Sequence, residues 1–159
     1  MKADYLRSET SLKQKLAHAR AAYIHAVGSL PDPLALENGP ILQNGLEFRS
    51  YDEIRSQFIE LGWAFFCIYE ACLERWLKSQ NIRLGKKRSL YDYFVEQGIT
   101  ITEENIEGLK IDRSIRNKLH HDDGENFEED QLGTEIHIEP QHLERFFDLF
   151  CWIEKAIED

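Results

Sequence analysis

The sequence contains no long hydrophobic run. Its longest uninterrupted apolar stretch, residues 61–69, has nine residues and includes Gly62, whereas a membrane-spanning helix needs about 20 apolar residues. The first residues, among them Lys2, Asp4 and Arg7, lack the apolar core that follows the basic residues of a secretory signal. We therefore expect a cytoplasmic protein that does not enter a membrane.

Cysteine is also scarce. Cys67, Cys72 and Cys151 are odd in number and form no C-x-x-C pair, so the ligand spacing of a structural zinc site is absent. Each lies in an apolar helical pattern, which predicts three reduced core residues. Residues 120–123 include histidine and aspartate, but adjacent residues on a helix rarely point at one metal ion, and no second cluster has firm ligand spacing. We expect no metal and no other cofactor.

Positive charge is in the minority. The chain has 19 Lys and Arg against 29 Asp and Glu, a net charge of −10, which argues against a protein that coats nucleic acid nonspecifically. The charges are unevenly distributed, because residues 122–135 carry seven acids and no Lys or Arg. A basic cluster that could contact RNA phosphates consists of Arg83, Lys86, Lys87 and Arg88. A solvated basic loop is the alternative interpretation.

The apolar residues that are present repeat mostly at helical spacing. The 159 residues, 42% of them hydrophobic, fit a single domain covering 1–159. The pattern predicts helices over about 8–27, 50–79, 89–98 and 109–121, and a last helix opened by Pro140. Residues 28–40 contain Pro31, Pro33, Gly39 and Pro40 and are predicted to be a loop with one short helical turn near 34–37. Residues 134–139 alternate as one short strand would.

The helix over residues 50–79 is expected to be central because it has two apolar stripes. The stripe with the spacing of a bundle seam contains Ile54, Phe58, Leu61, Phe65, Ile68 and Cys72. The stripe beside it contains Ile59, Phe66, Tyr69, Leu73 and Trp76. Gly62 costs a helix about 1 kcal/mol relative to Ala and suggests close packing. The fold class predicted is all-α, an antiparallel bundle of four main helices plus short helices.

The helix over residues 109–121 has two chemically different faces. At 100° per residue, Ile111, Ile115 and Leu119 share the side that docks on the bundle. The other side carries Arg113, Arg116, Asn117 and His120, and His121 falls at its edge.

Part of this polar face resembles a known signature. Arg116-Asn117-Lys118-Leu119-His120-His121 resembles the R-N-x-x-x-H form of the R-x4-6-H motif of HEPN domains. The order of elements is similar as well, with a long apolar helix before the motif and an amphipathic helix after it. The resemblance implies a metal-independent endoribonuclease of a toxin–antitoxin or phage-defence system. It also implies a homodimer with two motifs facing one shared cleft, an RNA substrate, and an antitoxin or defence-system partner.

The implied roles agree with the chemistry of the side chains. Arg116 would hold the scissile phosphate, because its planar cation matches phosphate geometry. His121 would transfer a proton as the ribose 2′-hydroxyl attacks phosphorus. Asn117 could orient the histidine or bind a phosphate oxygen. On an ideal helix His120 lies closer to Arg116, while the family spacing favours His121.

Other interpretations of these residues are open. Arg116 and the histidines could be exposed cations near a helix C-terminus. Glu70 interrupts the apolar centre of the long helix and could support the motif, since some HEPN enzymes carry an acidic residue there, or it could form an ordinary ion pair.

The sequence also departs from one subtype. HEPN toxins controlled by nucleotidyltransferase antitoxins have a tyrosine two residues after the motif histidine, where this chain has Asp123, so control by adenylylation is in doubt. The rival function is a catalytically inactive HEPN module that binds RNA, a nucleotide or a protein. A third interpretation, a generic helical interaction domain, would be favoured if the motif face were buried within the chain.

Overall fold

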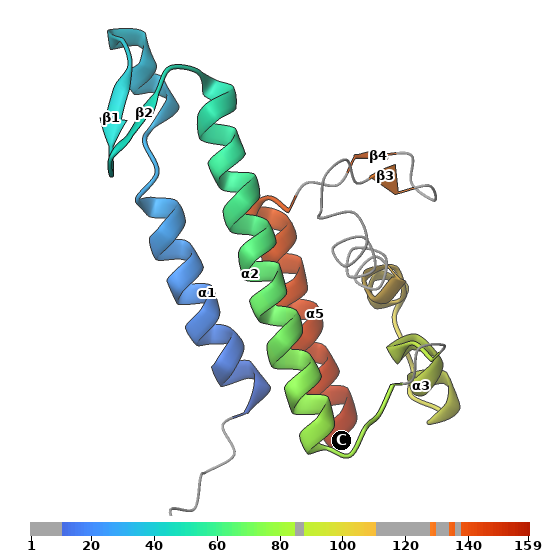
Figure 1. Ribbon diagram of the computed structural model, residues 1–159. Coiled ribbons are helices and arrows are strands. Elements are labelled where there is room, and N and C mark those ends of the chain that lie inside the picture. Colours follow the sequence, from blue (N-terminus) through green and yellow to red (C-terminus); the bar gives the residue numbers. More distant parts are fainter. Residues whose placement is uncertain (1–10, 85–87, 111–127, 130–133, 136–137) are drawn as a thin grey trace, which may run out of the picture.

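The computed structural model describes residues 11–84, 88–110, 128–129, 134–135 and 138–159, and the fold is mostly helical. Three long helices, α1 (Leu12–Gly28), α2 (Tyr51–Ser79) and α5 (Pro140–Glu158), pack against one another. Figure 1 shows that α2 and α5 run in the same direction and α1 runs opposite to both. Within the described ranges, no helix is long and apolar enough to cross a membrane.

The starts of the long helices follow from capping residues. The Ser50 hydroxyl accepts a hydrogen bond from the backbone N–H of Glu53, so α2 begins where the sequence predicts. Pro140 occupies the first turn of α5, also as predicted. The first helix was predicted to begin near residue 8, but α1 begins at Leu12 because the Ser11 side chain caps it.

A hairpin between α1 and α2 was not predicted. Strands β1 (Ile41–Gln43) and β2 (Leu46–Phe48) pair antiparallel after a 3₁₀ helix, Pro33–Asn38, which confirms the predicted helical turn. Asn44 and Gly45 form the two-residue turn with φ values of 52° and 79°. Positive φ at both positions gives the hairpin turn whose twist matches that of its strands.

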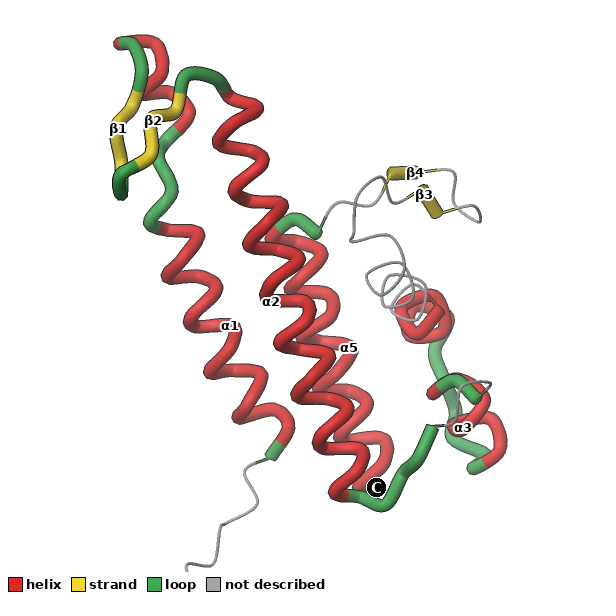
Figure 2. Tube along the Cα trace, in the orientation of Figure 1, coloured by secondary structure: helices red, strands yellow, loops and turns green. Residues whose placement is uncertain are grey.

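Shorter elements follow α2 (Figure 2). Helix α3 (Leu90–Glu96) is capped by Ser89 and followed by Gly98 at a φ of 69°, as the sequence predicts. The next helix was predicted to begin near Leu109 but is already helical from residue 103. Strands β3 (Glu128–Glu129) and β4 (Thr134–Glu135) pair antiparallel, so the predicted strand at 134–139 has a partner, and residues 138–139 are not part of it.

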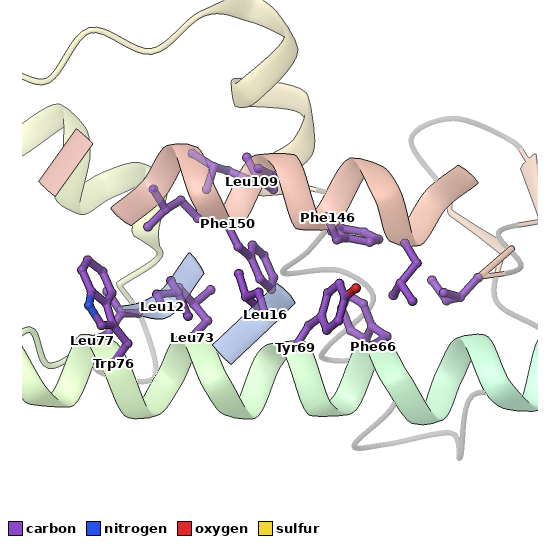
Figure 3. Packing of buried hydrophobic residues seen from close by; sticks show 14 of the residues in the cluster. Leu12, Leu16, Phe66, Tyr69, Leu73, Trp76, Leu77, Leu109, Phe146 and Phe150 are labelled. Atoms are coloured by element: carbon purple, nitrogen blue, oxygen red, sulfur yellow. The ribbon is translucent and has the colours of Figure 1, made fainter. Parts of the chain in front are cut away.

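The core lies where α2 meets both α1 and α5. Buried aromatic and aliphatic residues from these helices gather in one layer (Figure 3), among them Phe66, Tyr69 and Phe150. The stripe predicted as the bundle seam is only partly buried, and Ile68 keeps 42% of its surface exposed. The neighbouring stripe faces the core instead, because the face of α2 that contacts two helices is the one most fully covered.

Three contacts fix how the long helices pack. A Cβ on Gly62 of α2 would lie 1.8 Å from the backbone oxygen of Ile138, so the close packing suggested by this glycine is confirmed. Arg20 of α1 donates to both carboxylate oxygens of Glu144 on α5, at 2.7 and 2.9 Å. The carboxylate of Glu154 on α5 accepts a hydrogen bond of 2.7 Å from the backbone N–H of Lys13 in the first turn of α1.

Candidate functional site

The predicted catalytic segment lies outside the described residues. The predicted site residues concerned are four in this segment, Arg116, Asn117, His120 and His121, together with Arg113 before it and Lys86 and Lys87 of the basic cluster. Of the predicted site residues, the structure describes Glu70, Arg83 and Arg88. Glu70 and Arg83 line the same cavity, and Arg88 does not belong to its lining.

This cavity, of about 460 Å³, lies between three segments: the second half of α2, the residues 82–84 and 89–90, and Leu109 in the helical residues 103–110. We call it the α2 cavity. Its volume falls in the range of small-molecule sites, about 300–1,000 Å³. Its apolar lining comes from all three segments and consists of Leu73, Leu77, Ile82, Leu84, Leu90 and Leu109.

The turn after α2 creates one wall of the α2 cavity. Asn81 adopts a φ of 60°, and the N–H of Ile82 donates to the carbonyl of Leu77 at 2.9 Å. The N–H of Asn81 donates to the carbonyl of Lys78 at 3.1 Å. These two bonds form the left-handed helix end known as a Schellman motif, which turns the chain back on the last turn of the helix. Ile82 is buried as a result, and Arg83 is directed to the cavity.

The charged lining follows one side of α2. Glu70, Glu74 and Lys78 succeed one another at intervals of four residues, the spacing of neighbours on one helical face. Glu70 is half-buried and has one buried carboxylate oxygen, whereas Glu74 and Lys78 are exposed and form an ion pair of 3.1 Å. Arg83 is exposed as well. Negative charge therefore lies toward residue 70 and positive charge toward residues 78 and 83.

Arg88, the last member of the predicted basic cluster, is directed to α3. Its guanidinium forms an ion pair with Glu96 and lies 5.2 Å from the ring centre of Tyr93. Lys110 makes a similar contact, 5.6 Å from the ring centre of Tyr91. A phosphate at Arg88 would compete with Glu96, so Arg83 is the more accessible cation of the two.

The sequence reasoning missed Glu74 and Lys78. Both stand four residues after a neighbour on the same face of α2, so the pattern Glu70, Glu74, Lys78 was available in the sequence. It carried no signal of a site, however, because an exposed i, i+4 Glu-Lys pair occurs on many surface helices. Only the packing of residues 82–84, 89–90 and Leu109 beside this face makes it the side of a cavity.

The cysteines are not among the lining residues of the α2 cavity. All three are free; Cys67 is exposed, so its prediction as a core residue was wrong, and Cys72 and Cys151 are half-buried. Partial burial raises the pKa of each thiol above its usual value. Among the described side chains, no group of three or more His, Cys, Asp and Glu could hold a metal ion.

The arrangement has the chemistry of a binding site. Apolar walls can take a flat ring, carboxylates can accept hydrogen bonds, and Arg83 can meet an anion at the exposed end. Arg116, outside the described residues, follows Leu109 by seven positions in the sequence. Comparisons of the chain with models of protein families, with curated proteins and with solved structures found no match.

Proposed function

We propose that this protein is a metal-independent endoribonuclease of the HEPN type. Its fold would be a four-helix antiparallel bundle in which the helix containing residues 103–110 continues through the motif as the fourth main helix. The active form would be a cytoplasmic homodimer that cleaves RNA in a shared cleft. A toxin or phage-defence role, with an antitoxin or defence-system partner, belongs to the same proposal.

One observation carries this proposal. The R-N-x-x-x-H pattern at 116–121 follows a described helical segment whose Leu109 lines the α2 cavity together with Glu70 and Arg83. An acidic residue on the long helix and a cation after it thus share a cavity with Leu109, seven positions before Arg116 in the sequence. This juxtaposition is what a catalytic arginine and histidine would need as support and as a binding surface for the RNA chain.

The chemistry requires few protein groups. RNA carries its own nucleophile, the 2′-hydroxyl, so neither serine nor cysteine has to attack. Arg116 would stabilise the charge that develops on the phosphorane-like transition state. His121 would accept or donate the proton. Asn117, His120 and Glu70 would orient these groups, and Arg113 and Arg83 would position the substrate.

The test is cleavage of RNA by three purified variants beside the parent protein. Arg116→Ala and His121→Ala should each reduce the cleavage rate strongly, on the order of 10²-fold or more for a lost acid or base, and His120→Ala should reduce it less. Parent activity should survive a strong chelator, because Arg116 rather than a metal meets the charge. Melting temperatures of the variants separate lost chemistry from unfolding.

Full activity in folded Arg116→Ala and His121→Ala proteins would contradict the assignment, and so would activity that a chelator abolishes and one metal ion restores. The rival is then a catalytically inactive module that binds RNA, a nucleotide or a protein. The observation that favours this rival is the net charge of −10 together with two carboxylates in the lining of the α2 cavity, since such a surface repels the backbone of a long polyanion.

A further inference from the structure

The α2 cavity has a polarity along its length. Glu70 and Lys78 stand eight residues apart on α2, which corresponds to about 12 Å along the helix axis. The half-buried carboxylate lies at one end, and the exposed cations Lys78 and Arg83 lie at the other. A ligand that fits this order has hydrogen-bond donors at one end, an apolar body, and an anion at the opposite end.

We propose that the α2 cavity binds a guanine nucleotide. The proposal rests on the ribonuclease proposal for its choice of an RNA component as ligand, but its readout is binding and not cleavage. The ring would lie between Leu73 and Leu77 on one side and Leu84 and Leu90 on the other, and its phosphate would meet Arg83.

The choice of guanine follows from the carboxylates. The Watson–Crick edge of guanine presents two neighbouring donors, N1–H and the N2 amino group, and a carboxylate has two acceptor oxygens that can receive parallel hydrogen bonds. Adenine presents a ring acceptor next to its amino group, which a carboxylate oxygen repels. Glu70, whose half-buried carboxylate lies at the end of the cavity away from Lys78 and Arg83, therefore selects guanine over adenine.

The placement of the phosphate follows from exposure. The guanidinium of Arg83 is on the exposed part of the lining, where a bound phosphate can keep part of its hydration. Lys78 lies on the same part of the cavity, although its ammonium is shared with Glu74 at 3.1 Å. Arg83 can form two parallel hydrogen bonds to one phosphate, so it is the main anion contact.

The test is calorimetric titration of the full chain with GMP, AMP and guanosine. GMP should bind, and the affinity for AMP should be lower by about tenfold or more. This is the effect of losing one charge-assisted hydrogen bond. Arg83→Ala should weaken GMP about tenfold and leave guanosine, which has no phosphate, nearly unchanged. Glu70→Gln should weaken GMP and guanosine alike.

Matched controls come from the same helix. Arg75→Ala and Glu60→Gln change exposed residues of α2 that are not among the lining residues, and GMP binding should stay unchanged. No GMP binding at millimolar concentration, equal affinity for AMP, or equal losses in control and cavity variants would overturn the proposal. Circular dichroism of each variant checks that the helices are intact.

Competition with short single-stranded RNA identifies the source of the base. Displacement of GMP by an oligonucleotide with one guanine, and not by oligoadenylate, supports a guanine of the RNA substrate as the ligand. No displacement by either supports a free guanine nucleotide, and equal displacement by both overturns guanine recognition. If Arg116→Ala loses cleavage while its GMP binding stays intact, GMP binding in the α2 cavity does not depend on the catalytic motif. The two proposals can then fail independently of each other.

Discussion

Single residues decide how closely neighbouring segments approach α2, and Gly62, which faces Ile138 just before α5, is the clearest example. A methyl group there would meet the Ile138 backbone oxygen at 1.8 Å. Gly62→Ala should therefore lower the free energy of unfolding by about 2 kcal/mol, because overpacking costs more than the roughly 1 kcal/mol that alanine adds to helix stability. Urea denaturation monitored by circular dichroism measures this change.

Gly28→Ala is the matched control for Gly62→Ala. Gly28 ends α1, and a Cβ built on it has no neighbouring atom within 4 Å among the described residues. Its replacement should leave stability unchanged or raise it slightly. Equal stabilisation by both substitutions would show that Ile138 does not press on Gly62 in solution.

Tyr23 links stability to pH. Its buried hydroxyl has no hydrogen-bond partner in the described part of the chain, and burial raises its pKa from 10 to about 12. The fold favours the neutral form of the Tyr23 side chain. The contribution of this preference to the free energy of unfolding is therefore fully present below pH 10 and is lost as the pH rises toward 12. Between pH 10 and 12 the free energy of unfolding of Tyr23→Phe should therefore fall less than that of the parent protein, by on the order of 2 kcal/mol.

At neutral pH the same substitution should be nearly neutral, because it removes a buried hydroxyl that forms no bond. Tyr51→Phe, at a tyrosine that is 60% exposed, is the control and should leave the alkaline unfolding curve unchanged. Some loss of stability at alkaline pH should persist in the Tyr23→Phe and Tyr51→Phe proteins, since burial also raises the pKa of Tyr69. An unchanged alkaline midpoint in Tyr23→Phe would contradict the assignment.

At the scale of elements, α5 supplies a cap for α1. The first N–H groups of a helix lack partners within the helix, and Glu154, 7% exposed, accepts a hydrogen bond from the Lys13 N–H. Glu154→Ala should lower the free energy of unfolding by about 1–2 kcal/mol. Glu154→Gln should lower it less, because the amide oxygen can still accept this bond.

Amide hydrogen exchange locates the effect of Glu154→Ala. Faster exchange at Lys13 relative to the middle of α1 is expected, and Glu158→Ala, an exposed position on the same helix, should leave it unchanged. Equal exchange at Lys13 in the parent and Glu154→Ala proteins would mean that another group satisfies this N–H.

Elements with local end signals could be predicted from the sequence, and those fixed by distant contacts could not. Ser50, Ser89 and Pro140 mark helix starts by their own chemistry, and α2, α3 and α5 begin there. The Asn44-Gly45 hairpin carried an equally local signal that the prediction overlooked. The stripe of α2 that faces the core could not be predicted from the sequence. Both stripes are apolar, and only the positions of α1 and α5 decide between them.

The candidate site shows the same limit. Glu70 and Arg83 were predicted separately, one as a support for the motif and the other as part of a basic cluster. Their common cavity depends on the left-handed turn at Asn81, which folds the chain back beside α2. Asparagine tolerates positive φ, but the sequence does not show which face of the preceding helix the returning chain will cover.

At the scale of the whole molecule, the proposed dimer brings together two chains of net charge −10. We expect light scattering at micromolar concentration to give twice the 18.7 kDa mass of one chain. Moderate salt should favour association, because it screens the repulsion between the two acidic surfaces. A mass of one chain at every salt concentration would contradict the dimer.

The contact between Glu154 and Lys13 also has a consequence for synthesis on the ribosome. The two residues are 141 positions apart, so at about 5–20 residues per second the Lys13 N–H remains without this partner for on the order of ten seconds. During that time the apolar sides of α1 and α2 can cover each other, but the surface that α5 will bury stays open. The nascent chain is therefore most exposed to aggregation and to chaperones just before its last helix is made.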